Sequence, residues 1–321
     1  MRDRIAVIGA GVSGLTSAVL FAERGHLTTI FAHEIGERTT SAAAGAIWFP
    51  YDAEPAGAVI KWSLTTFARL RDICAETLSG VSMVELRCFA TAGELPMPDW
   101  APSLGARRLE HGELLASFTS GFTVVVPLID TSRYLDYLAA RFRAAGGSIV
   151  PNILFSAGDF EKHKQLRRDV DCIINCSGIG AQRLVPDPDL EPHRGQIAIV
   201  EKLALGYAVV CDDSPFMYAF PRSGDCVFGG TNTISDERAP DPADTERIVA
   251  ECSRVLNIDR PRVLAERVGL RPFRRSGVRL EAEVLGEGRT LIHNYGHGGS
   301  GFTLSWGCAE EVFDLARTRL R

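Results

Sequence analysis

The stretch that decides the fold stands near the start of the chain, where residues 4–8 read Arg-Ile-Ala-Val-Ile and are followed by Gly9, Ala10, Gly11, Val12, Ser13 and Gly14. The short apolar run predicts a buried strand, and residues 13–24 carry apolar side chains at helical spacing until Gly25. Residues 27–32, Leu-Thr-Thr-Ile-Phe-Ala, predict a second strand. A strand, a helix and a strand in this order form the β-α-β unit that is typical of dinucleotide-binding domains.

The six residues from Gly9 to Gly14 form a G-x-G-x-x-G motif between the predicted strand and helix. Glycines there let the backbone turn tightly and approach a pyrophosphate at the helix N-terminus. The second strand ends in Ala32, His33 and Glu34. We expect Glu34 to bind the ribose hydroxyls, since an acid at this place argues against a 2′-phosphate. His33 is a candidate for a contact with the adenine edge.

Composition excludes several classes of protein. The 321 residues, 45% of them hydrophobic, suggest about two domains, and a net charge of -5 without a basic stripe argues against nucleic acid as a partner. No apolar run approaches the roughly 18 residues needed to span a bilayer. Without a signal-peptide pattern or a peroxisomal address at the C-terminal Arg-Leu-Arg, we expect no membrane partner and a cytoplasmic location. Eight cysteines without a CxxC pair predict reduced thiols and no metal site.

Hydrophobic periodicity outlines the rest of the chain. It predicts helices over 57–78, 131–145, 242–256 and 301–319, and strands at 83–90, 122–127, 171–175, 195–201, 207–211, 216–221, 226–230, 262–270, 278–284 and 290–293. The expected fold class combines α/β and α+β. A Rossmann-like cofactor-binding domain is built from residues 1–50, 131–180 and 290–321, interleaved with a sheet-rich substrate-binding domain from residues 51–130 and 181–289.

Residues 38–51 combine hydroxyl groups, small side chains and then aromatic rings. Small residues allow a flat group to lie close to the backbone, although a tight packing turn is the alternative. The candidates for cofactor contact in this segment are Arg38, Thr39, Thr40, Ala44, Gly45 and Ala46.

Near the C-terminus, four glycines at 296, 298, 299 and 301 lead into the last predicted helix. The amide groups and the positive end of the helix dipole then point at whatever occupies the cleft. A reduced flavin carries negative charge around N1 and the C2 oxygen, which such a helix start stabilises. The candidates are Gly298, Gly299, Ser300, Gly301, Phe302 and Thr303.

These segments together resemble one family. Residues 293–309 resemble the C-terminal signature of D-amino acid oxidases, and residues 39–51 resemble the flavin-contacting turn of that family. Four further stretches, 175–178, 194–197, 218–222 and 269–272, are similar to the family in the same order. The chain is therefore identified as a member of the D-amino acid oxidase family, which uses FAD.

The resemblance implies roles for individual residues. Arg271 and Tyr218 are expected to bind the substrate carboxylate, the arginine through a two-pronged fork and the tyrosine through its hydroxyl. The carbonyl of Gly299 is expected to accept a hydrogen bond from the substrate amine. Thr303 and the neighbouring amides would meet the pyrimidine edge of the flavin, and Ser177 and Gly178 would lie near the cofactor.

The implied reaction is oxidative deamination of a D-amino acid, in which hydride passes to FAD and oxygen is reduced to hydrogen peroxide. The products are a 2-oxo acid and ammonia, and positioning rather than a general base supplies the catalysis. In the stretch 212–217 a second family tyrosine is replaced by Ser214, which suggests a short or open lid.

Several alternatives stay open from the sequence. An oxidase for D-aspartate, glycine or a secondary amine belongs to the same group, and a second cation from Arg222, Arg274, Arg275 or His297 would favour acidic substrates. Phe49 and Phe220 favour neutral, apolar side chains instead. A flavin-binding protein without turnover, a pyridine-nucleotide dehydrogenase and a homodimer also remain open.

Overall fold

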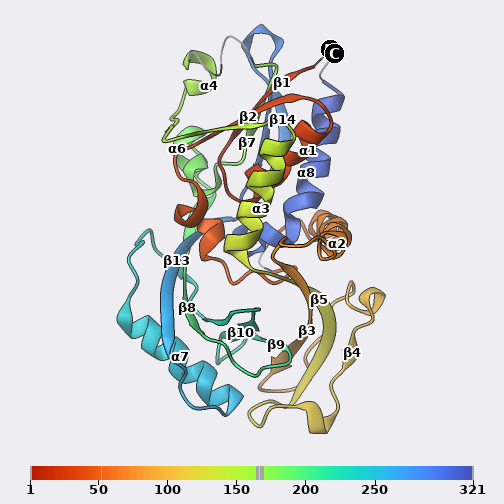
Figure 1. The fold of residues 1–321 in the computed structure, drawn as a ribbon, viewed down its shortest axis with the longest axis vertical. Helices are drawn as coiled ribbons and strands as arrows, with labels where there is room; N and C mark the ends of the chain where they lie inside the picture. Colours follow the sequence, from red (N-terminus) through yellow and green to blue (C-terminus); the bar gives the residue numbers. More distant parts are fainter. Residues whose placement is uncertain (1, 52, 164–165, 167–169, 320–321) are drawn as a thin grey trace.

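The computed structural model describes residues 2–51, 53–163, 166 and 170–319. It contains two β-sheets that lie one above the other, with the chain passing between them several times (Figure 1). The predicted combination of a Rossmann-like domain with a second, sheet-rich domain is confirmed. In the described part of the chain, no helix is long and apolar enough to cross a membrane.

The first sheet has six strands in the order β14-β15-β7-β1-β2-β6. Its bounds are β1 Arg4–Ile8, β2 Leu27–Ala32, β6 Ser148–Pro151, β7 Cys172–Asn175, β14 Arg279–Val284 and β15 Thr290–Tyr295. Strand β1 pairs in parallel with β2 on one side and with β7 on the other. All its residues after Arg4 are buried, which explains the apolar run.

Helices cover the first sheet. Helix α1 (Val12–Glu23) lies between α3 (Thr131–Ala144) and α8 (Gly301–Arg317), and α2 (Ala56–Ile73) packs along α8 at the other side of it (Figure 1). Ten of the twelve residues of α1 are buried, all except Ser13 and Glu23, so this helix is enclosed on most sides. The short helices α4 (Asp159–Lys162) and α6 (Ala181–Leu184) stand at the opposite side (Figure 1).

The second sheet is mainly antiparallel. Its strands are β3 Val81–Ala90, β4 Arg107–Arg108, β5 Ser120–Ile129, β8 Leu190–Glu201, β9 Ala208–Cys211, β10 Met217–Pro221, β11 Asp225–Gly229, β12 Thr233–Ile234 and β13 Val263–Arg274. Helix α7 (Pro242–Leu256) covers the outer face, where it buries Ile248, Val249 and Cys252 against β8, β10 and β11 (Figure 1). The other face looks toward the first sheet.

Two observations correct the expected division of the chain. Strand β14 was assigned to the substrate domain, but it pairs with β15 along its whole length and closes the edge of the first sheet. Its segment therefore joins that sheet at Arg279, ahead of the expected start at 290. Helix α2 was also assigned to the substrate domain, yet it packs on α8, because Val59 and Trp62 share an apolar cluster with Leu304.

Candidate active site

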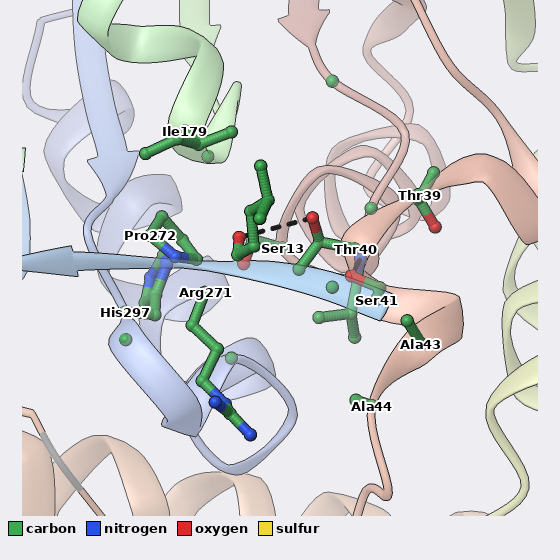
Figure 2. A pocket seen from close by; sticks show the side chains of 18 of the residues that line it. Ser13, Thr39, Thr40, Ser41, Ala43, Ala44, Ile179, Arg271, Pro272 and His297 are labelled. Carbon is green, nitrogen blue, oxygen red and sulfur yellow. Dashed lines mark hydrogen bonds between the residues drawn. The ribbon is translucent and has the colours of Figure 1, made fainter. Parts of the chain in front are cut away.

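A cavity of about 860 Å³ lies where the two sheets meet. Its wall runs from the glycine loop after β1, past the start of α8, to Arg271 and Tyr218 in the second sheet. Figure 2 shows Thr39, Thr40, Ala43 and Ala44 along one side, with Ile179, Pro272 and His297 across from them. A volume of this size suits a large cofactor together with a small substrate.

The glycine loop lines the cavity through residues 9–13. Gly9 has a φ of +105°, and a Cβ there would lie 2.4 Å from the carbonyl oxygen of Cys176. Gly14 does not line the cavity: a Cβ at this residue would lie 2.0 Å from the Gly9 oxygen, so its role is close packing of helix on strand. Gly11 faces the cavity, which leaves the backbone open to a pyrophosphate.

The start of α1 receives a side chain that the sequence did not single out. The Ser41 Oγ accepts a hydrogen bond from the Val12 amide at 2.9 Å, and Gly11 provides no side-chain cap. A Cβ on Gly11 would lie 2.9 Å from this same Oγ atom. Ser41 therefore stands beside the helix N-terminus where an anion is favoured. Its position next to the candidates Thr39 and Thr40 was the signal available in the sequence.

The end of β2 carries Glu34 and His33, and both line the cavity. The Glu34 carboxylate is held by Arg238, with Nη1 to Oε1 at 2.6 Å and Nη2 to Oε2 at 3.2 Å. Arg238 comes from the loop between β12 and α7, and it also lines the cavity. Sequence reasoning missed this partner because 204 residues separate the two.

The segment after β2 forms one wall of the cavity. Thr39 closes a turn, because its hydroxyl donates to the Gly36 carbonyl at 2.8 Å. The Thr40 hydroxyl donates to the Leu270 carbonyl of β13 at 3.4 Å (Figure 2). The predicted residues Ala44, Gly45 and Ala46 line the cavity as well. Arg38 does not: its side chain is exposed and lies outside the wall.

The start of α8 forms the facing wall through Gly298, Gly299, Gly301, Phe302 and Thr303. The Thr303 hydroxyl accepts from the Phe49 amide at 3.1 Å and donates to the Phe49 carbonyl at 3.0 Å. Ser300 is buried behind the wall and holds the backbone of Tyr51 in the same way. Both hydroxyls therefore fix the segment 49–51 against the helix N-terminus.

Ser177 and Gly178 follow β7 and also line the cavity. The Asn175 side-chain oxygen accepts from the Ser177 hydroxyl at 2.6 Å and from its amide at 3.2 Å. The buried Asn175 amide nitrogen lies 3.2 Å from Nδ1 of His293 on β15. These hydrogen bonds fix the loop that follows β7.

Arg271 and Tyr218 come from β13 and β10 of the second sheet, and both line the cavity. The Arg271 guanidinium donates from Nη1 to the Thr231 carbonyl at 3.0 Å and lies flat against Gly195, where a Cβ would come within 2.4 Å of Nη2. Burial raises the pKa of Tyr218, and the charge of the adjacent Arg271 acts in the opposite direction. A fixed cation beside a phenol suits a carboxylate.

Aromatic rings surround these two groups. Tyr218 stacks on Phe220 with ring centroids 4.7 Å apart and an interplanar angle of 16°. A Cβ on Gly45 would lie 3.0 Å from both rings, so glycine lets the backbone approach them closely. Phe49, Tyr51 and Phe216 complete the apolar wall. Phe216 and Asp212 bring the loop between β9 and β10 to the cavity, whereas the exposed Ser214 does not line it.

Three of the four further cations considered from the sequence lie outside the cavity wall and are paired. Arg222 binds Asp225 at 2.6 Å, Arg274 binds Asp187 at 2.8 Å, and Arg275 binds Glu191 at 3.1 Å. His297 lines the cavity, but burial lowers its pKa to about 4, so it is neutral near pH 7. Its Nε2 lies 3.0 Å from the Asn294 side-chain oxygen and donates to it.

Comparison with known proteins shows which family the chain belongs to. Residues 4–315 match the family described as FAD dependent oxidoreductase. A D-amino-acid oxidase from Rubrobacter xylanophilus is 41% identical over 99% of this chain and 97% of its own. One from Streptomyces coelicolor is 37% identical over 97% and 96%.

Among solved structures, glycine oxidase from Geobacillus kaustophilus superimposes with a TM-score of 0.80 at 19% identity, covering 99% of this chain and 96% of that one. At this identity the likeness supports the fold alone. The match over residues 4–315 and the two relatives together decide the family. The chain belongs to the FAD dependent oxidoreductases.

Proposed function

We propose that this protein is a D-amino acid oxidase. The observation that carries the proposal is one continuous cavity that joins a dinucleotide-type glycine loop to a fixed guanidinium beside a phenol. The glycine loop and the starts of α1 and α8 fit a flavin dinucleotide, since they offer backbone close approach and two helix N-termini. The Rubrobacter and Streptomyces relatives carry the same activity in their names.

The residues at the substrate end have distinct tasks in this proposal. Arg271 holds the carboxylate by a charge-assisted fork, and Tyr218 donates a second hydrogen bond to it. The Gly299 carbonyl accepts from the amine. FAD, when bound, supplies the acceptor for two electrons, and oxygen as the final acceptor yields hydrogen peroxide. Because two substituents of Cα are fixed, only one enantiomer can present its hydrogen to the cofactor while its side chain enters the aromatic part of the cavity.

Neutral substrates suit the cavity better than acidic ones. Phe49, Phe216 and Phe220 supply apolar surface, and His297 is neutral because it is buried. Arg238 is a cation on the wall, but Glu34 already balances its charge. Asp212 lines the same cavity and adds negative charge to its wall, which disfavours a second negative group on the substrate.

The test is a peroxide assay with every D- and L-amino acid and with glycine. We expect turnover of neutral D-amino acids, release of the 2-oxo acid and ammonia in equal amounts, and no turnover of L-enantiomers. Comparable rates with D- and L-alanine would contradict the proposal. Preferred turnover of D-aspartate would instead assign the protein to the acidic branch. The cytoplasmic location and the homodimer stay predictions.

A further inference from the structure

An ion pair on the wall of the cavity joins two distant parts of the chain. Glu34 ends β2 of the first sheet, whereas Arg238 lies in the loop that follows β12 of the second. The guanidinium contacts both carboxylate oxygens, at 2.6 and 3.2 Å. Both residues line the cavity, so the pair stands at its wall and not elsewhere on the surface.

A buried arginine, Arg194, holds the backbone of the loop that carries Arg238. Arg194 on β8 is only 5% exposed, and it donates to the carbonyl oxygens of Glu237 at 3.2 Å and Ala239 at 2.9 Å. These are the residues on either side of Arg238. Arg194 is itself fixed by Asp244 at 2.9 Å. The backbone of Arg238 is therefore anchored on both sides while its side chain extends to the other sheet.

The stability of the fold alone does not account for this arrangement. The Arg238 side chain is 51% exposed, and an exposed pair of this kind contributes little to the stability of the fold. A guanidinium fork does, however, fix the plane of a carboxylate. An ionised carboxylate has about four acceptor positions, so two remain after the fork is made.

We propose that Glu34 and Arg238 form a clamp for the adenosine half of FAD, in which Arg238 orients the Glu34 carboxylate toward the ribose hydroxyls. Arg238 is a positioning residue in this clamp, supplied by the substrate-domain side of the cavity. The inference rests on the proposed placement of FAD, with the pyrophosphate at Gly11 and the ribose beside β2. It predicts that release of the cofactor requires the two sheets to separate at this pair.

An alternative role for Arg238 predicts the opposite effect of its removal on FAD affinity. If Arg238 merely occupied Glu34 in the empty protein, the ribose would have to displace it, and removing Arg238 would strengthen FAD binding. The two cases are distinguished by the dissociation constant and the release rate of FAD from apoprotein, measured through quenching of flavin fluorescence. Neither measurement depends on turnover.

We expect Arg238→Gln to raise the Kd of FAD by about 5- to 20-fold, mainly through faster release, and Glu34→Gln to do the same or more. The double variant should bind FAD no more weakly than Glu34→Gln alone, because Arg238 acts through Glu34. Arg238→Lys keeps the charge without the fork and should fall between the wild type and Arg238→Gln.

Arg260→Gln is the matched control, since Arg260 forms an exposed ion pair with Glu246 and does not line the cavity. The Arg260→Gln protein should bind FAD as tightly as the wild type does. The melting temperature of each apoprotein variant should equal that of the wild-type apoprotein. An unchanged or lower Kd in Arg238→Gln, with tight binding by the wild type, would overturn the clamp alone. A wild type that fails to bind FAD would overturn the placement of the cofactor as well.

Discussion

At the scale of single residues, Arg271 should decide whether substrate binds. Its guanidinium rests on Gly195 and is tied to Thr231, so it is held in place before any substrate arrives. A charge-assisted bidentate pair in a partly dry site is worth on the order of 3 kcal/mol. We expect Arg271→Ala to lower kcat/KM by at least about 100-fold, with normal FAD content in the absorption spectrum.

Two variants make this comparison specific. Tyr218→Phe removes one neutral donor and should cost about 1–2 kcal/mol, seen mainly in KM. Arg275→Ala should leave the kinetics unchanged, because Arg275 pairs with Glu191 and lies outside the cavity wall. Wild-type kinetics in Arg271→Ala, combined with a large loss in Arg275→Ala, would show that the carboxylate is held elsewhere.

His297 should make the folded state sensitive to acid. Burial lowers its pKa to about 4, below the value of about 6.5 expected in the unfolded chain. The unfolded state therefore binds more protons between these values, and stability is lost as the pH falls from about 6.5 toward 4. Between pH 7 and 5 this group alone should remove about 2 kcal/mol. Denaturant unfolding at both pH values should show a smaller loss in His297→Gln, which keeps a donor for Asn294. An identical loss in both proteins would contradict this account.

At the scale of elements, the β1-α1 loop should control cofactor binding. Gly11 faces the cavity, and a Cβ there already comes within 2.9 Å of the Ser41 Oγ. The larger branched side chain of Gly11→Val should fill the space of the pyrophosphate and give colourless apoprotein. Gly57→Ala in α2 is the control, because a Cβ at that exposed position meets nothing within 4 Å. Stoichiometric FAD in purified Gly11→Val would rule out this placement.

Local sequence patterns predict some of the helices and strands and miss others. The β1-α1-β2 unit was predictable, since its apolar periodicity and its glycines are local signals. Strand β6 was missed because it is short, with two exposed and two partly buried residues, and carries no apolar pattern. Strand β14 was predicted but was placed with the wrong sheet, because the apolar pattern of a strand does not specify which strand it pairs with.

The residues of the candidate site also divide into those that a local motif marks and those that depend on tertiary contacts. Most of the predicted site residues line the cavity, because family motifs mark them locally. The exceptions are Gly14, Arg38 and Ser300. Arg238 carries no local signal, as its role depends on a contact with β2 across the cavity. Ser41 stands beside the candidates Thr39 and Thr40 in the sequence, but its hydrogen bond with the Val12 amide is a contact between segments 29 residues apart.

At the scale of the whole molecule, the cavity lies where the two sheets meet. Its wall combines the glycine loop of the first sheet with Arg271 and Tyr218 of the second. A ligand that fills such a cavity binds the folded state and not the unfolded chain, so it stabilises the fold by mass action. FAD should therefore hold both halves together.

We expect the melting temperature of apoprotein to rise with FAD concentration, with a gain of about 2.7 kcal/mol at 100 times the Kd. FMN lacks the adenosine half and leaves the region of Gly11 and Glu34 without its partner, so it should stabilise the protein less at equal concentration. Differential scanning calorimetry with each ligand measures this difference. Because the cavity is shared, a single transition should move as a unit as FAD is added. A transition of the second sheet that stays fixed while the first one rises would show that the cofactor binds only the glycine loop and that the two halves unfold independently.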